Sequence, residues 1–140
     1  MLKKVHITPE GLWQHQPRTY TQVIRVGIEP AEVVFISGQV AVDDAGEIVG
    51  IDDFGQQAVH VINNLRRALD AAGVTGSDIV KLTTFVVPPV HTVLPAIREA
   101  LSTLFDRDSP PANTIVGVHS LARPEYLLEI EAIAVPGALV

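Results

Sequence analysis

Two long stretches of the chain have the apolar spacing of an amphipathic helix, and they limit how much of a sheet the chain can cover. Along residues 54–72, apolar side chains recur at steps of three and four, with Asp52 or Asp53 as the expected N-cap and Gly73 as the expected C-terminal stop. Residues 93–105 repeat this pattern. Two such helices cover only one face of a five- or six-stranded sheet.

Segments rich in β-branched and aromatic residues predict the strands of that sheet. They are residues 19–26, 33–37, 78–87, 112–118 and 127–135. The second and the last of these segments look apolar on both faces. The helices and strands together predict an α+β fold. Because one sheet face would otherwise expose apolar side chains to water, we expect the chain to form an oligomer.

The chain has 140 residues without a repeat or a linker, which predicts one domain over residues 1–140. Residues 1–18 are polar and contain Pro9, Gly11 and Pro17, so we expect them to form a loose lead-in. No apolar run has the length that crosses a bilayer, and the start lacks the pattern of a secretory signal, so no membrane partner is expected. The absence of cysteine suits a reducing cytoplasm, which is the expected location.

The charge balance argues against nucleic acid as a main partner. The formal net charge is −6, and the basic residues are scattered, with Lys3-Lys4 and Arg66-Arg67 as the only adjacent pairs. Proteins that bind phosphate backbones normally present a clustered basic patch. We therefore expect that nucleic acid is not a main partner of the protein.

Several short motifs, spread over most of the chain, occur together in an order and spacing that are similar to one family. They are Tyr20-Thr21-Gln22, residues 34–40 (VFISGQV), Ala71-Ala72-Gly73, residues 78–86 (DIVKLTTFV), Pro111-Ala112 and residues 121–135 (LARPEYLLEIEAIAV). In this combination the chain resembles the Rid (reactive intermediate deaminase) family, also called YjgF.

The resemblance implies both an architecture and an activity. The implied fold is chorismate-mutase-like, with a mixed, mostly antiparallel sheet and two long helices on one face, and three subunits pack their sheets into a central β-barrel. Ligand sites then lie in clefts between subunits, so the implied partners are further copies of the chain and a small molecule. The best-known members hydrolyse enamines and imines, such as 2-aminoacrylate and its imine tautomer, to a 2-keto acid and ammonia. No cofactor is implied.

The sequence departs from the family directly after Pro-Ala, where Asn113 replaces an arginine that grips the substrate carboxylate in the best-known members. A charge-assisted clamp of this kind contributes roughly 1.5–3 kcal/mol, against about 0.5–1.5 kcal/mol for a neutral hydrogen bond. We therefore expect ordinary 2-imino acid deamination to be weakened. Either Arg18, Arg25 or Arg123 compensates, or the ligand is not a 2-imino acid.

Glu131 and Tyr20 are the candidates for catalysis, and Glu131 has to be distinguished from the nearby Glu129. Glu129 and Glu131 are two apart on an expected strand, so their carboxylates should lie on the same side, about 7 Å apart. Such a pair can raise one pKa and hold a water, although a solvated strand face has the same spacing. The resemblance selects Glu131 to orient the attacking water, leaves Glu129 structural, and makes Tyr20 the pocket tyrosine.

Further residues are predicted to bind the substrate. They are Asn113, Ser37, Gly38, Gly117, Val118 and Arg123. Gly38 would let a ligand approach the backbone, although Ser37-Gly38 is also explained by a simple turn. Backbone groups near Gly117 and Val118 would bind a substrate oxygen or a water. An arginine at the position of Arg123 is most often part of a surface or interface ion pair.

The leading hypothesis from these residues is a hydrolase that adds water to an imine, an enamine or a related C–N bond of a small metabolite, with Glu131 positioning the water. The alternative is a small-ligand-binding or regulatory trimer without turnover. Weak RNA cleavage, which has been ascribed to some family members, is third and is disfavoured by the acidic charge. The histidines lack the spacing of metal ligands, so no metal is expected.

Overall fold

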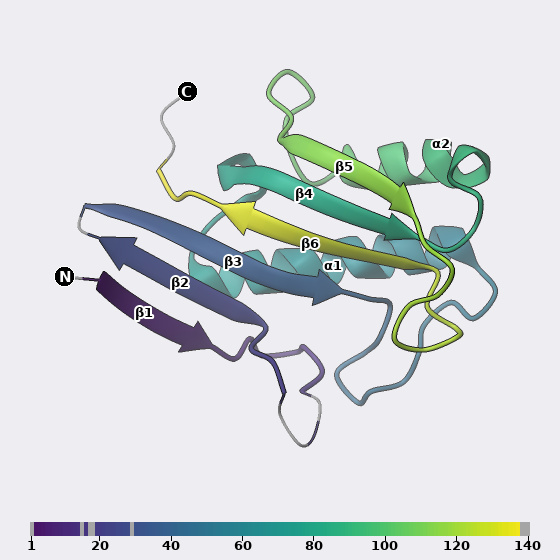
Figure 1. Ribbon diagram of the computed structural model, residues 1–140, viewed down its shortest axis with the longest axis horizontal. Coiled ribbons are helices and arrows are strands. Elements are labelled where there is room, and N and C mark those ends of the chain that lie inside the picture. The colour runs from purple at the N-terminus through teal and green to yellow at the C-terminus, as the bar shows by residue number, and fades with distance from the viewer. Residues whose placement is uncertain (1, 15, 17–18, 29, 138–140) are drawn as a thin grey trace.

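A six-stranded sheet forms one layer of the protein, and two helices form the other (Figure 1). The computed structural model describes residues 2–14, 16, 19–28 and 30–137. The strand order is β1-β2-β3-β6-β4-β5, and every neighbouring pair is antiparallel except β4 and β5. The elements are β1 (Leu2–Ile7), β2 (Val23–Ile28), β3 (Ala31–Gln39), α1 (Phe54–Ala72), a 3-10 turn (Gly76–Asp78), β4 (Ile79–Val86), α2 (Val90–Leu101), β5 (Ala112–Gly117) and β6 (Leu128–Ala134).

Both helices cover the same face of the sheet, as the sequence predicts, and the core lies between the two layers (Figure 1). Alternate residues of the central strands point into it. On β6 these include Leu128 and Ile130, and on β4 they include Leu82 and Val86, all nearly inaccessible to water. The expected α+β class and the mixed, mostly antiparallel sheet are therefore confirmed.

Helix α1 has the bounds that its apolar spacing predicts, because both of its ends are marked by capping residues. The Asp53 side chain accepts a hydrogen bond from the Gln56 backbone N–H at 3.0 Å, which makes Asp53 rather than Asp52 the N-cap. At the other end, Gly73 has a φ of 70°, a left-handed conformation that glycine adopts without steric cost.

Helix α2 begins and ends earlier than the expected 93–105. It begins at Val90, directly after an N-cap residue, Pro89, that has no side-chain capping bond. Its end is set by Ser102 and Thr103, whose hydroxyls donate to the carbonyls of residues three positions earlier at 2.7 Å. Such bonds offer the backbone an alternative to the helix, so the apolar periodicity continues past the point where the helix ends.

The expectation of a loose lead-in over residues 1–18 is wrong for its first part. Leu2–Ile7 forms strand β1, which pairs antiparallel with β2 at the edge of the sheet. Lys3 and Lys4 are exposed there, and charged residues are common on edge strands because they discourage pairing with another chain. These same lysines make the segment read as polar in the sequence.

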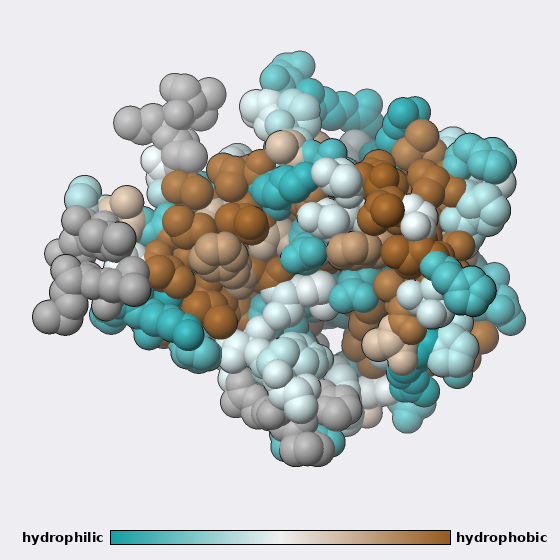
Figure 2. All heavy atoms as spheres, in the orientation of Figure 1, coloured by the Kyte–Doolittle hydropathy of each residue, from teal (hydrophilic) through white to brown (hydrophobic). Residues whose placement is uncertain are grey.

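The face of the sheet opposite the helices is uncovered within one chain. Phe35 lies between the buried residues Val34 and Ile36, so its side chain points to the open face, where 45% of it is exposed. Val116, on the edge strand, is 39% exposed. Figure 2, drawn from this side, shows broad hydrophobic areas on the open face. As predicted, the two helices cover one face of the sheet, and apolar side chains remain exposed on the other face.

Among the described residues, no helix combines the length and the apolar character that spanning a bilayer requires.

Candidate functional site

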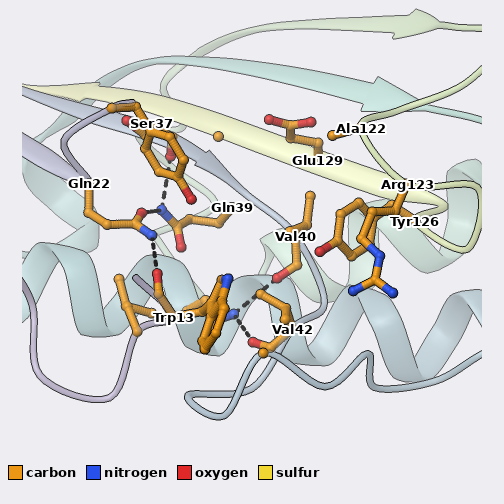
Figure 3. Close-up of a pocket in the computed structure, with 15 residues that line it drawn as sticks. Trp13, Gln22, Ser37, Gln39, Val40, Val42, Ala122, Arg123, Tyr126 and Glu129 are labelled. Atoms are coloured by element: carbon orange, nitrogen blue, oxygen red, sulfur yellow. Dashed lines mark hydrogen bonds between the residues drawn. The ribbon is translucent and has the colours of Figure 1, made fainter. Parts of the chain in front are cut away.

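A cavity of about 510 Å³ lies where β3 ends and β6 begins. The segment before β2 and the loop before β6 complete its walls (Figure 3). Its volume is in the range of sites for small organic ligands. The lining residues are Leu12, Trp13, Tyr20, Gln22, Ser37, Gly38, Gln39, Val40, Val42, Gly46, Asn64, Ala122, Arg123, Tyr126 and Glu129.

A pair of buried glutamines joins the N-terminal segment to β3 at one side of this cavity. The Gln39 side-chain amide donates to Gln22 Oε1 at 2.7 Å, and the Gln22 amide donates to the Trp13 carbonyl at 3.0 Å (Figure 3). Gln39 also donates to the Ser37 carbonyl at 3.0 Å. Because buried amides without partners are costly, these bonds fix the position of the Trp13 backbone relative to the strand.

Helix α1 fixes a further part of the wall through Asn64. Its side-chain amide donates to the carbonyls of Val40 and Val42, both at 3.0 Å (Figure 3). The Asn64 Oδ1 in turn accepts from Arg67 at 2.9 Å. The segment that follows β3 is therefore held against the helix, although it makes no regular strand pairing there.

Glu129 is placed over the backbone of β3 by a glycine. Ser37 and Gly38 lie in an irregularity of the pairing between β3 and β6, and a Cβ atom added to Gly38 would overlap the Glu129 carboxylate. Gly38 therefore gives room to the glutamate as well as to any ligand. This close approach requires glycine at position 38.

The environment of Glu129 favours its protonated form. Burial raises the pKa of the Glu129 carboxyl above its usual range, and the like charge of Glu131 raises it further. Burial also raises the pKa of the Tyr20 hydroxyl, with smaller contributions from Tyr126 and Glu129. A carboxyl with a raised pKa, inside a cavity and beside two phenols, is suited to exchange a proton with a bound substrate or water.

Glu131, the glutamate that the sequence analysis selected, is exposed. It lines a second and more open hollow on the open face of the sheet, together with Val118 and Glu129. Glu129 thus borders both cavities, whereas Glu131 borders only this hollow. Of the two carboxyls, only Glu129 lies at the wall of the larger cavity.

The remaining predicted residues fall into two groups. Tyr20, Ser37, Gly38 and Arg123 line the larger cavity with Glu129. Asn113 does not line it: it lies exposed on β5, where its Oδ1 accepts a hydrogen bond from the Thr84 hydroxyl at 3.1 Å.

Asn113 and Glu129 point to opposite faces of the sheet within one chain. Asn113 is aligned with Leu82, whose side chain is buried beneath the helices, while Glu129 is aligned with Phe85, which points the other way. Gly117, also on β5, lies beside Val90 at the start of α2 and lines neither the large cavity nor the hollow. One chain alone therefore does not combine Asn113 with the Glu129 cavity.

The three arginines named as substitutes for the missing clamp differ in position. Arg123 lines the cavity, with its guanidinium 6.0 Å from the centre of the Tyr126 ring and its Nε 3.9 Å from a Glu125 oxygen. Arg25 lies on β2, paired with Glu32 at 3.5 Å. Arg18 is outside the described residues.

Sequence reasoning missed several lining residues because their roles depend on packing between distant segments. Trp13 was read as part of the lead-in, and Tyr126 appeared only within a motif. One sequence signal could have located this wall. Gln22 and Gln39 are polar residues next to apolar strand residues that are expected to be buried, and a buried glutamine needs hydrogen-bond partners nearby. Within the part of the chain that the structure describes, no group of three or more histidine, aspartate or glutamate side chains is placed to hold a metal ion.

Comparison with known proteins agrees with this architecture. The family model for endoribonuclease L-PSP matches residues 14–136. A RutC family protein of Pyrococcus abyssi is 34% identical over 116 residues, which are 82% of this chain and 84% of that protein. A solved structure from Thermotoga maritima has a TM-score of 0.82 at 30% identity and covers 96% of this chain and 98% of its own.

Two further solved structures are similar over nearly the whole chain. RidA from an Antarctic Psychrobacter has a TM-score of 0.78 at 26% identity, covering 93% of this chain and 98% of that one. E. coli TdcF, solved with bound serine, has a TM-score of 0.77 at 29% identity, covering 95% of this chain and 99% of that one. The expected chorismate-mutase-like fold of the Rid/YjgF type is thereby confirmed.

Proposed function

Because the chain belongs to the endoribonuclease L-PSP family, whose members are also known as Rid or YjgF proteins, we propose that it hydrolyses the C=N bond of a small imine or its enamine tautomer. The observation that carries this proposal is the Glu129 carboxyl, which has a raised pKa and lies over Gly38 at the wall of a ligand-sized cavity. Hydrolysis of an imine needs one group that can accept and return a proton at this place.

The reaction proceeds by addition and elimination. The substrate reacts as the iminium, protonated at nitrogen. The ionised Glu129 carboxylate takes a proton from water as the water oxygen bonds to the iminium carbon and the C=N electron pair moves to nitrogen, which gives a neutral carbinolamine. The Glu129 carboxyl then gives its proton to the carbinolamine nitrogen. As the C–N bond breaks and ammonia leaves, the C=O bond forms, and the hydroxyl proton passes to the Glu129 carboxylate and from there to solvent. Tyr20, whose raised pKa keeps its hydroxyl protonated, donates a hydrogen bond to the reacting oxygen or nitrogen.

Arg123 supplies the positive charge that Asn113 cannot. It is the arginine that lines the cavity among the described residues, and its separation of 3.9 Å from Glu125 is at the outer limit of an ion pair. Half of its side chain is exposed, so its guanidinium can turn toward a bound carboxylate. A 2-imino acid therefore remains within the proposed substrate class.

The assay uses imines generated in situ by an amino-acid oxidase, with semicarbazide as a competing trap. Hydrolysis by the protein should lower the yield of semicarbazone. Glu129→Gln should reduce kcat/KM by roughly 10²–10⁴, the usual contribution of a general acid-base residue, whereas the matched variant Glu131→Gln should lose less than about tenfold. Wild-type protein that gives no acceleration over buffer with any imine would reject the proposal.

The loss of the family arginine favours a second candidate, a ligand-binding trimer without turnover. If no imine is hydrolysed, Tm measurements against a panel of amino acids and 2-keto acids test this candidate, because a ligand that binds only the folded state raises the Tm. Asn113→Arg should then create imine hydrolysis if the missing charge is the cause.

Weak RNA cleavage is not favoured by any observation in the site.

A further inference from the structure

The wall of the large cavity around Trp13 is mainly apolar, because the amides of Gln22 and Asn64 beside it are already hydrogen-bonded within the chain. Glu129 and Ser37 lie toward the sheet side of the opening, while Trp13 and Val42 lie at the far side (Figure 3). Leu12 and Val40 add further apolar surface to the lining. A molecule that places a reactive C=N bond beside Glu129 therefore directs its other substituent toward Trp13.

The cavity as a whole is larger than a small imine needs. A volume of about 510 Å³ corresponds to roughly 17 water-sized groups at about 30 Å³ each. A three-carbon imino acid would leave most of that space to water, in contact with the apolar side chains of the far wall. Filling it with an aromatic or branched aliphatic substituent removes this apolar surface from water and so strengthens binding.

The Trp13 wall is fixed before any ligand arrives. The ring lies against Gly46, where an added Cβ atom would come within 2.9 Å of three ring carbons. The Trp13 carbonyl is held by Gln22, and the neighbouring Leu12 is buried in the core. Because this wall neither folds into the cavity nor needs ordering on binding, little conformational entropy is lost when a substituent packs against it.

We propose that this protein selects imines or enamines that carry a bulky apolar substituent, aromatic or branched aliphatic, and that Trp13 is the residue that determines this preference. This inference rests on the proposed hydrolysis at Glu129 for its chemistry. The cavity on which the inference is based is formed by residues of a single chain.

The test compares imines made by D-amino-acid oxidase from D-phenylalanine, D-leucine and D-alanine. The imine carbon is planar, so the configuration of the precursor is lost. We expect kcat/KM to be at least about tenfold higher for the two larger imines than for the alanine-derived one, the discrimination that apolar pockets typically reach. Equal or higher values for the alanine-derived imine would overturn the inference.

Three variants assign the preference to the cavity. Trp13→Ala should lower the ratio of large-to-small kcat/KM about tenfold, and Trp13→Phe should lower it less. If Trp13→Ala does not fold, Val40→Phe, which fills the cavity from the β3 side, should lower the same ratio. The control is Val59→Ala, which shortens an exposed side chain on the outer surface of α1 and should leave the ratio unchanged. A folded Trp13→Ala protein with the wild-type ratio would contradict the role of Trp13.

A binding measurement separates this inference from the proposed hydrolysis. If no imine is turned over, Tm shifts with phenylpyruvate and pyruvate decide the question, because both acids resemble reaction products. A larger shift with phenylpyruvate in wild type, lost in Trp13→Ala, would support the pocket and reject only the hydrolysis. Equal shifts, or none, would overturn the pocket as well.

Discussion

At the scale of single residues, the proposed function depends most directly on the contact between Gly38 and Glu129. The carboxylate occupies the space that a side chain at position 38 would need. Glu129 and Glu131 point to the same side of β6, so their spacing alone does not distinguish them. What distinguishes them is the irregularity in the β3–β6 pairing at residues 36–39, which brings a glycine under one carboxylate and not the other.

The first prediction at this scale concerns Gly38→Ala. The new methyl group displaces the flexible end of Glu129, so kcat/KM for imine hydrolysis should fall by about 10² or more while the fold persists. Gly55→Ala is the matched control, because an added Cβ there comes no closer than 3.7 Å to a neighbouring side chain. Helix propensity predicts that this control gains up to about 1 kcal/mol of stability. Equal activity of the two variants would argue against Glu129.

The pH dependence of activity provides the second prediction. If the ionised form of Glu129 accepts the proton from water, kcat/KM rises with pH as this carboxyl ionises, and the midpoint reports its raised pKa. The negative charge of Glu131 opposes that ionisation. Glu131→Gln removes the opposing charge, so the pKa of Glu129 should fall and the acidic limb should move to lower pH. A limb that stays in place would show that the two carboxylates are not coupled.

At the scale of secondary structure, the sequence predicted those elements whose ends are marked by local chemistry. Helix α1 has a capping aspartate and a left-handed glycine, and its bounds agree with the prediction. Helix α2 has no side-chain cap, and its end is set by hydroxyl-to-carbonyl bonds that an apolar pattern does not contain. The sequence analysis missed strand β1 because this edge strand is held by its backbone pairing with β2, and its residues do not show an apolar pattern.

The site residues divide in the same way, into those that local motifs identify and those whose position depends on contacts with distant segments. Tyr20, Ser37, Gly38 and Arg123 were identified because they occur in motifs, and they line one cavity. The position of Trp13 depends on a hydrogen bond to Gln22, nine residues away along a segment without regular structure. Apolar periodicity carries no information on such a segment.

The third prediction tests the cap of α1. Asp53→Ala removes the acceptor of the Gln56 N–H and should lower the free energy of unfolding by about 1 kcal/mol, within a range of roughly 0.5–2 kcal/mol. Urea unfolding followed by circular dichroism measures this change. Asp52→Asn is the control, because Asp52 has a positive φ of 58°, which asparagine also tolerates, and the cap does not depend on its charge. A larger effect of the control would mean that Asp52 caps the helix.

At the scale of the whole molecule, the uncovered face of the sheet is the reason to expect an oligomer, and the family resemblance makes the expected oligomer a trimer. Phe35 and Val116 expose apolar surface on this face, and Asn113 is exposed on its edge strand. A trimer that packs these faces together would bury the apolar surface. Within one chain Asn113 and Glu129 point to opposite faces, so Asn113 can come near a Glu129 cavity only by way of another subunit.

The fourth prediction follows from that packing. Phe35→Lys places a charge on the open face, where it would be buried without a partner in the trimer, at a cost of several kcal/mol for each subunit. Size-exclusion chromatography with light scattering should therefore give three times the chain mass for wild type and a smaller mass for Phe35→Lys. Val59→Lys, at a site 59% exposed on the outer surface of α1, is the control and should retain the wild-type mass. If wild type is monomeric at micromolar concentration, the trimer is wrong, and Asn113 then has no route to the cavity, so that Asn113→Arg should leave imine hydrolysis unchanged.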